Sequence, residues 1–277
     1  GKFYVLQNTP LKWNIDANIS FNRNRIGGLK ADQFAQKLWS SADEVFIQRN
    51  GCPIGAIYGY VEDGFYDNLA EVMASPSADI RAKGAGMIGE IKYRNFDDNP
   101  DITSADRVII GDTNPDFVYG LTSNFEWKGV TLSFFLQGSQ GNDIFNGNLM
   151  DMKMGNVGNI TREAYNTRWT EANAAQAKWP KAVSGYERNM LISNRYVEDG
   201  SYLKLKSLNI GYVWKPNFKG ISNVNVYASA TNLFTITGYS WFDPEVNAFG
   251  SDASRRGVDV YSYPSSRTFS LGIKVDF

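Results

Sequence analysis

The last nine residues of the chain alternate strictly between apolar and polar side chains. The apolar positions are Phe269, Leu271, Ile273, Val275 and Phe277. The positions between them are Ser270, Gly272, Lys274 and Asp276. Because successive side chains of a strand point to opposite faces, this pattern predicts a β-strand with one apolar and one polar face. A strand of this kind that ends on Phe277 suits a sheet with lipid on one side and water on the other.

Five further segments alternate in the same way. Their apolar positions run through residues 13–21, 117–127, 130–136, 208–214 and 224–230. Lys128-Gly129 between two of these segments predicts a tight hairpin turn. Leu203 and Leu205 have the opposite phase to residues 208–214, which predicts a β-bulge near Lys206 and Ser207. The sequence therefore predicts six antiparallel strands.

The connections between these strands alternate between long and short. Residues 23–116, 141–199 and 235–265 are the long ones, whereas 128–129 and 215–222 are short. Outer-membrane barrels have short periplasmic turns and longer extracellular loops. If Phe277 lies on the periplasmic side, every short connection falls on the periplasmic side and every long one on the extracellular side. Trp13, Trp127 and Trp214 then fall at the periplasmic ends, as an aromatic girdle does. We predict an all-β fold, part of a large antiparallel transmembrane β-barrel with long extracellular loops.

Composition excludes several functional classes. Histidine is absent and Cys52 is the single cysteine, so Ser-His and Cys-His hydrolases and cysteine metal clusters are excluded. Lys and Arg number 28 against 29 Asp and Glu, with no basic block, so no nucleic-acid partner is expected. Two alternatives stay open. One is a soluble surface glycan-binding β-sandwich, whose strands also alternate, and the other is a secreted hydrolase that uses Asp243 and Glu245.

Several stretches carry a family resemblance. They begin at Ile110 (IGDTNPDFVYG), Leu132 (LSFFLQG), Arg195 (RYVEDGSYLKLK), Asp243 (DPEVN) and Ser262 (SYPSSRTF). Together with Gly141-Asn-Asp-Ile-Phe-Asn146, Asn232-Leu-Phe-Thr235, Pro53-Ile-Gly-Ala-Ile-Tyr-Gly-Tyr60 and Asp63-Gly64, they resemble the SusC/RagA-like family of TonB-linked outer-membrane transporters. The match spans nearly the whole chain.

The resemblance implies a bacterial outer-membrane barrel of about 22 strands, of which this chain is a C-terminal part. Six strands cannot close such a barrel, so we expect the N-terminal strands and the plug to lie outside residues 1–277. The family implies active import of oligosaccharides or peptides and no enzymatic activity. Its implied partners are a SusD-like surface lipoprotein as lid, TonB acting through the plug, the remaining strands and membrane lipid.

One segment has the spacing of a calcium-binding loop. Asn95, Asp97, Asn99, Thr103 and Asp106 occupy positions 1, 3, 5, 9 and 12 of an EF-hand-like pattern, and oxygen ligands at this spacing suit Ca²⁺. Position 6 is Pro100 instead of glycine, and its fixed φ cannot copy the sharp turn. Ca²⁺ is thus a candidate ligand, with an acidic surface loop as the alternative.

The expected extracellular loop at 235–265 contains aromatic and acidic side chains together. Tyr239, Trp241, Phe242 and Asp243 are candidate ligand-binding residues, because sugars stack on aromatic rings and both sugars and peptides bond to carboxylates. Packing of this loop against its neighbours is the alternative interpretation.

Overall fold

The computed structural model describes residues 1–37, 44–154, 159–183, 187–217 and 220–277. The predicted extracellular regions 23–116 and 141–199 and the predicted turn at 215–222 each include a few residues outside these ranges.

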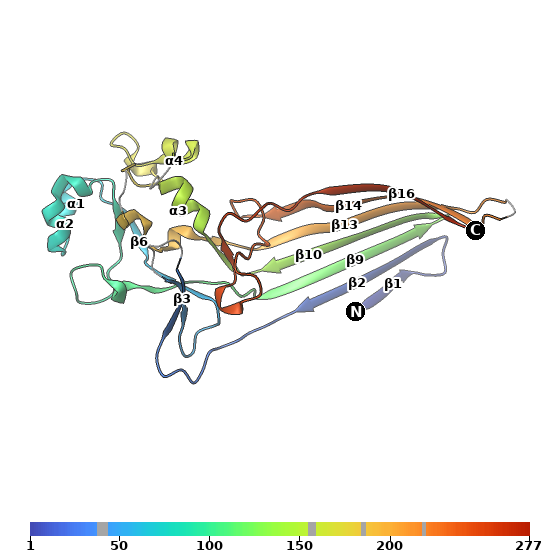
Figure 1. Ribbon diagram of the computed structural model, residues 1–277, viewed down its shortest axis with the longest axis horizontal. Helices are drawn as coiled ribbons and strands as arrows, with labels where there is room; N and C mark the ends of the chain where they lie inside the picture. Colours follow the sequence, from blue (N-terminus) through green and yellow to red (C-terminus); the bar gives the residue numbers. More distant parts are fainter. Residues whose placement is uncertain (38–43, 155–158, 184–186, 218–219) are drawn as a thin grey trace.

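A long antiparallel sheet forms one end of the molecule (Figure 1). Within the described residues it contains seven strands, which in spatial order are β1 (Lys2–Leu6), β2 (Leu11–Ser20), β9 (Phe117–Trp127), β10 (Val130–Gln140), β13 (Tyr202–Trp214), β14 (Asn223–Thr237) and β16 (Thr268–Asp276). All six predicted strands form. The added strand β1 was not predicted, because Phe3, Tyr4, Val5 and Leu6 are a continuous apolar run without alternation.

Strand register lines up the two kinds of side chain in separate rows. One row consists of Trp13, Phe125, Leu132, Ile210, Ala228 and Leu271. The next row consists of Asn14, Asn124, Ser133, Asn209, Ser229 and Ser270. In the first row the rings of Trp13 and Phe125 stack with centroids 5.3 Å apart. In the second, Asn124 Nδ2 donates to Asn14 Oδ1 at 3.0 Å and Ser133 Oγ donates to Asn124 Oδ1 at 2.7 Å. The sheet therefore has one apolar and one polar face over six strands.

The apolar face is exposed. Relative exposure is 70% for Phe269, 80% for Leu271 and 69% for Ile273, and Ile210 and Tyr212 on β13 are exposed as well. A contiguous apolar surface of this kind marks contact with a membrane or another protein. No helix within the described residues is long and apolar enough to cross a membrane.

Two local features set the shape of the sheet. Lys128 and Gly129 both have positive φ, 47° and 89°, which a two-residue hairpin turn of the I′ type requires. Phe135 pairs with Ser207 and Leu136 with Leu205, so Lys206 is the extra residue of a bulge against β10. Against β14, Lys206 lies opposite two residues, Asn232 and Leu233. The predicted hairpin and bulge are both confirmed.

The long connections fold together at the opposite end from the short turns (Figure 1). We call this part, residues 23–116, 141–199 and 238–265 as far as they are described, the loop unit. Its small sheets consist of β3 (Gln33–Lys37), β4 (Glu44–Gln48), β5 (Ala56–Gly59) and β8 (Val108–Asp112); β6 (Glu62–Phe65) and β7 (Ile91–Tyr93); and β12 (Val197–Asp199), β11 (Asp143–Asn146) and β15 (Val258–Asp259). Its α-helices are α1 (Leu69–Met73), α2 (Ala78–Lys83), α3 (Gly147–Met154) and α4 (Arg162–Thr167). Short 3₁₀ helices lie at Gly84–Met87, Ser104–Asp106, Ala174–Gln176, Glu187–Met190, Asn194–Tyr196 and Ala253–Arg255.

One hydrophobic core joins all three connections. The first contributes Phe46 and Ile91, the second Phe145 and Tyr196, and the third Val258, each with no accessible surface. Burial of large side chains of this kind is the main favourable contribution to folding. The connections therefore form a packed unit with its own core instead of separate loops.

Candidate functional site

The segment that follows β14 folds back against the polar face of the main sheet. Lys204 on β13 is in the row of Gln137 and Thr235, which belongs to this polar face. Its side chain is 1% exposed, and its Nζ lies 2.8 Å and 2.9 Å from the two carboxylate oxygens of Asp243. This contact connects the barrel-type strand to the loop unit.

Glu245 completes the cluster. Its Oε2 lies 2.5 Å from Lys204 Nζ and 2.9 Å from Lys206 Nζ, and its Oε1 accepts a hydrogen bond from the Tyr202 hydroxyl at 3.1 Å. Two ammonium groups thus face two carboxylates. We call Lys204, Lys206, Asp243 and Glu245 the junction cluster.

Opposing effects determine the charge state of the two carboxylates. Burial by itself raises the pKa of Asp243, but hydrogen bonds and the charge of Lys204 outweigh it, so that the pKa lies below its usual range. Burial likewise raises the pKa of Glu245, and Lys204 and Lys206 more than offset it. Both carboxylates are therefore ionised at neutral pH.

The four predicted ligand-binding residues divide into two groups. Tyr239 is 5% exposed, and its hydroxyl donates to Asp259 Oδ2 at 2.6 Å. Asp243 forms an ion pair with Lys204. These two side chains hold the loop in place. Phe242, by contrast, is 66% exposed, and Trp241 meets it edge to face at a centroid distance of 5.2 Å. Phe242 also borders a pocket of about 190 Å³ whose lining includes Thr235, Thr237 and Arg267.

The predicted calcium segment forms a series of Asx turns. The side-chain oxygens of Asn95, Asp97 and Asn99 each accept the backbone N–H two residues later, at 2.9–3.1 Å. Asp106 is fully buried and caps a 3₁₀ helix, with its two oxygens accepting N–H groups of Phe96 and Thr103 at 2.7 and 2.8 Å. The oxygens of Asp106 are thus already engaged. Calcium binding through Asn95, Asp97 and Asn99 stays a prediction.

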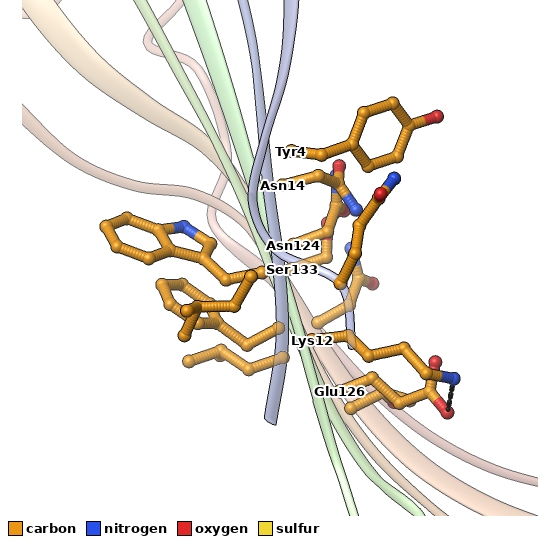
Figure 2. A pocket seen from close by; sticks show the side chains of 13 residues that line it. Tyr4, Lys12, Asn14, Asn124, Glu126 and Ser133 are labelled. Carbon is orange, nitrogen blue, oxygen red and sulfur yellow. Dashed lines mark hydrogen bonds and ion pairs between the residues drawn. The ribbon is translucent and has the colours of Figure 1, made fainter. Parts of the chain in front are cut away.

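A second hollow lies near the short turns of the sheet (Figure 2). It has a volume of about 400 Å³ and is bordered by Tyr4, Asn14, Asn124 and the ion pair between Lys12 and Glu126, at 3.1 Å. Its lining includes Asn14, Asn124, Ser133 and Asn209 of the polar row, together with Trp13, Phe125 and Leu132 of the apolar row. Both members of the ion pair are more than half exposed, which is typical of a hydrated wall.

A polar groove on the loop unit was not predicted from the sequence. Its volume is about 420 Å³, and its lining includes Glu62, Lys178, Arg195 and Glu198. Arg195 is ion-paired with Glu62 and lies over the ring of Trp179 at 5.1 Å. These residues come from distant parts of the chain, so no local spacing indicates the groove.

Comparisons with known proteins agree with this architecture. TonB-dependent receptor P3 of Formosa agariphila is 34% identical over 98% of the chain, and TonB-dependent receptor SusC of Bacteroides thetaiotaomicron is 26% identical over 96% of it. The solved structure of the RagAB peptide importer in its open-open state matches the whole chain with a TM-score of 0.72 at 20% identity. No family model matches the chain. The chain spans 24–27% of the length of these two curated relatives.

The fold defines a segment of a large antiparallel outer-membrane-type β-barrel with an ordered loop unit. The homologues of this chain are TonB-dependent receptors, SusC among them. The predicted fold class and the predicted resemblance to the SusC/RagA-like family are both confirmed.

Proposed function

We propose that this chain forms part of the wall and of the extracellular binding region of a TonB-dependent importer in the bacterial outer membrane. The observation that carries the proposal is the two-faced sheet. Its apolar row from Trp13 to Leu271 runs in register over six strands, exposed on β13, β14 and β16 and half-buried on β2, β9 and β10, while its polar row faces the other way. An apolar face of this kind is what a lipid-facing wall requires. The packed loop unit lies wholly at the other end from the short turns.

The cargo of this importer is a large nutrient, an oligosaccharide or a peptide. The RagAB relative is described as a peptide importer, and SusC is a TonB-dependent receptor. Trp241 and Phe242 at the junction are the aromatic side chains that we propose for ligand contact, because Phe242 is exposed and borders a pocket on the polar side and Trp241 packs against its ring.

The partners follow from the same assignment. A SusD-like surface lipoprotein closes over the loop unit, and TonB acts on a plug supplied by sequence outside residues 1–277. The free edges of β1 and β16 pair with the remaining barrel strands, since an open transmembrane sheet would leave backbone groups unpaired in lipid. The hollow of Figure 2 would face the plug in this arrangement.

Binding and gating, rather than bond cleavage, are the chemistry we assign. The two carboxylates of the hydrolase alternative, Asp243 and Glu245, form ion pairs with Lys204 and Lys206. Because they are ionised, they have no proton to donate as a general acid. The homologues are receptors and transporters. The soluble β-sandwich alternative is not favoured, because its apolar face would have to be covered, whereas Phe269, Leu271 and Ile273 are exposed.

Uptake measurements on cells that express the full-length receptor test the proposal. We expect uptake of a fluorescent oligosaccharide pool or of a fluorescent peptide pool that is lost when either the receptor or TonB is deleted. The receptor itself should require detergent for extraction from the outer-membrane fraction. A receptor that purifies folded from the aqueous fraction, or uptake that is unchanged without TonB, would contradict the proposal.

A further inference from the structure

We propose that the junction cluster is an anchor that positions Trp241 and Phe242 on the polar side of the barrel wall. Lys204 is its central positioning residue. The ligand contact that these two rings make belongs to the proposed function, and the anchor's role in transport rests on it.

The geometry fixes three consecutive residues directly after the aromatic pair. Asp243 is bound through both oxygens to Lys204, and the backbone N–H of Glu245 donates to Asp243 Oδ1 at 2.9 Å. Pro244 between them is buried and has a restricted φ. Since Phe242 precedes this fixed turn by one peptide bond, the position of its ring depends on the anchor.

Burial makes the anchor all-or-none. Lys204 is 1% exposed, so its ammonium group loses nearly all hydration and needs both carboxylates as partners. Loss of Lys204 leaves the carboxylate of Asp243 buried without its ion-pair partner, and the loop then leaves the wall as a whole. Two states, docked and released, are therefore expected instead of a continuum. A docked loop holds the aromatic rings ready for a ligand and reduces the entropy lost on binding.

The two lysines contribute unequally. Lys206 is the bulge residue, its side chain is 29% exposed, and within the described part of the chain its Nζ pairs with Glu245. Lys204 contacts both carboxylates. Loss of Lys204 should therefore release the loop, whereas loss of Lys206 should weaken it.

A spin label on the aromatic pair tests the anchor without any transport measurement. The full-length receptor, with Cys52→Ser as background, carries Phe242→Cys labelled with a nitroxide. We expect an immobilised spectrum in this parent. Lys204→Met should abolish the immobilised component, Lys204→Arg should restore it in part, and Lys206→Met should reduce it. Lys12→Met is the matched control, because it removes an exposed ion pair on the same face of the sheet.

Heat-modifiable migration in gels shows for each variant whether the barrel is folded. If Lys204→Met fails to fold, Glu245→Gln takes its place, since it leaves Lys204 paired with Asp243, and a reduced immobilised component is expected. An immobilised component as large as in the parent, in the folded Lys204→Met or Glu245→Gln receptor, or equal loosening by Lys12→Met, would overturn the anchor. Because the spectra are recorded without ligand, loss of uptake alone bears on the proposed function and not on the anchor.

Discussion

Glu90 is a buried carboxyl group in the loop unit. Its side chain is 1% exposed, and within the described residues neither carboxyl oxygen has a hydrogen-bond partner with good geometry. Burial raises the pKa of Glu90, and the side chain of Asn189 and the charges of Lys181, 3.6 Å away, and of Arg188 offset only part of this effect. The folded state thus prefers the protonated form more than the unfolded chain does.

We expect Glu90→Gln to remove a pH dependence of the loop unit. Since the pKa of Glu90 is higher in the folded state, its contribution to stability is complete below the ordinary glutamate pKa and is lost as pH rises through the folded value. Protection of the Tyr66 and Gly89 amides, which bond across this segment, should fall from pH 5 to pH 8 in the parent and stay level in Glu90→Gln. Hydrogen exchange measures the protection of these two amides in the parent and in Glu90→Gln. Greater protection at pH 8 in the parent would refute the assignment.

Gly138 gives a second prediction for a single residue. The ring of Tyr119 lies across the strand over this glycine, and an added Cβ would come within 2.2 Å of Tyr119 Cζ. Gly138→Ala should therefore lower the free energy of unfolding by about 1–3 kcal/mol, because the ring has to move. Gly238→Ala is the control, since its Cβ would meet nothing within 4 Å. Urea unfolding in lipid bilayers compares them, and equal midpoints would contradict the packing described.

At the scale of the single strand, β16 distinguishes lipid from water most clearly. Leu271 belongs to the apolar row and its neighbour Ser270 to the polar row. In a bilayer, Leu271→Arg should cost about 2–4 kcal/mol of unfolding free energy, whereas Ser270→Arg should cost far less. Unfolding in liposomes gives both values. Similar costs for the two substitutions would argue against a lipid-facing row.

The segment around Asn95–Asp97–Asn99 tests the calcium hypothesis. We expect this segment to bind Ca²⁺ weakly, with a Kd on the order of 10⁻⁴–10⁻³ M, because it offers few charged ligands. Calorimetric titration of the receptor with CaCl₂ should show a heat that Asp97→Ala removes. Asp32→Ala, which breaks an exposed ion pair with Arg49, serves as control. Titrations without any heat in the parent would remove calcium from the account.

Strands of the main sheet could be predicted because their register shows in the sequence. The alternation of apolar and polar residues and its phase change near Lys206 are local features of the sequence. The strands and the bulge could therefore be predicted from them. Strand β1 has no alternation to detect. Burial of Tyr239 depends on Asp259, twenty residues away, and Lys204 meets Asp243 across 39 positions. Such contacts follow from tertiary packing, which no local pattern encodes.

For the whole molecule, the division into a two-faced sheet and a packed loop unit is the central result. The sheet leaves its apolar face exposed, while the loop unit buries its own core from three distant connections. In the function proposed above, this packed loop unit is the part that a ligand and a lid contact. In our account, the outer membrane lies around the sheet and the loop unit lies outside the cell.

Labelling of single cysteines on intact cells tests this topology most directly. The receptor with Cys52→Ser carries one cysteine at a time, at Ser104 or Ser251 in the loop unit or at Lys128 in a short turn, and cells are treated with a maleimide polymer too large for porins. We predict labelling at Ser104→Cys and Ser251→Cys in intact cells, and labelling at Lys128→Cys only after the outer membrane is opened. Labelling at Lys128→Cys in intact cells, or no labelling of either loop-unit cysteine, would contradict the account.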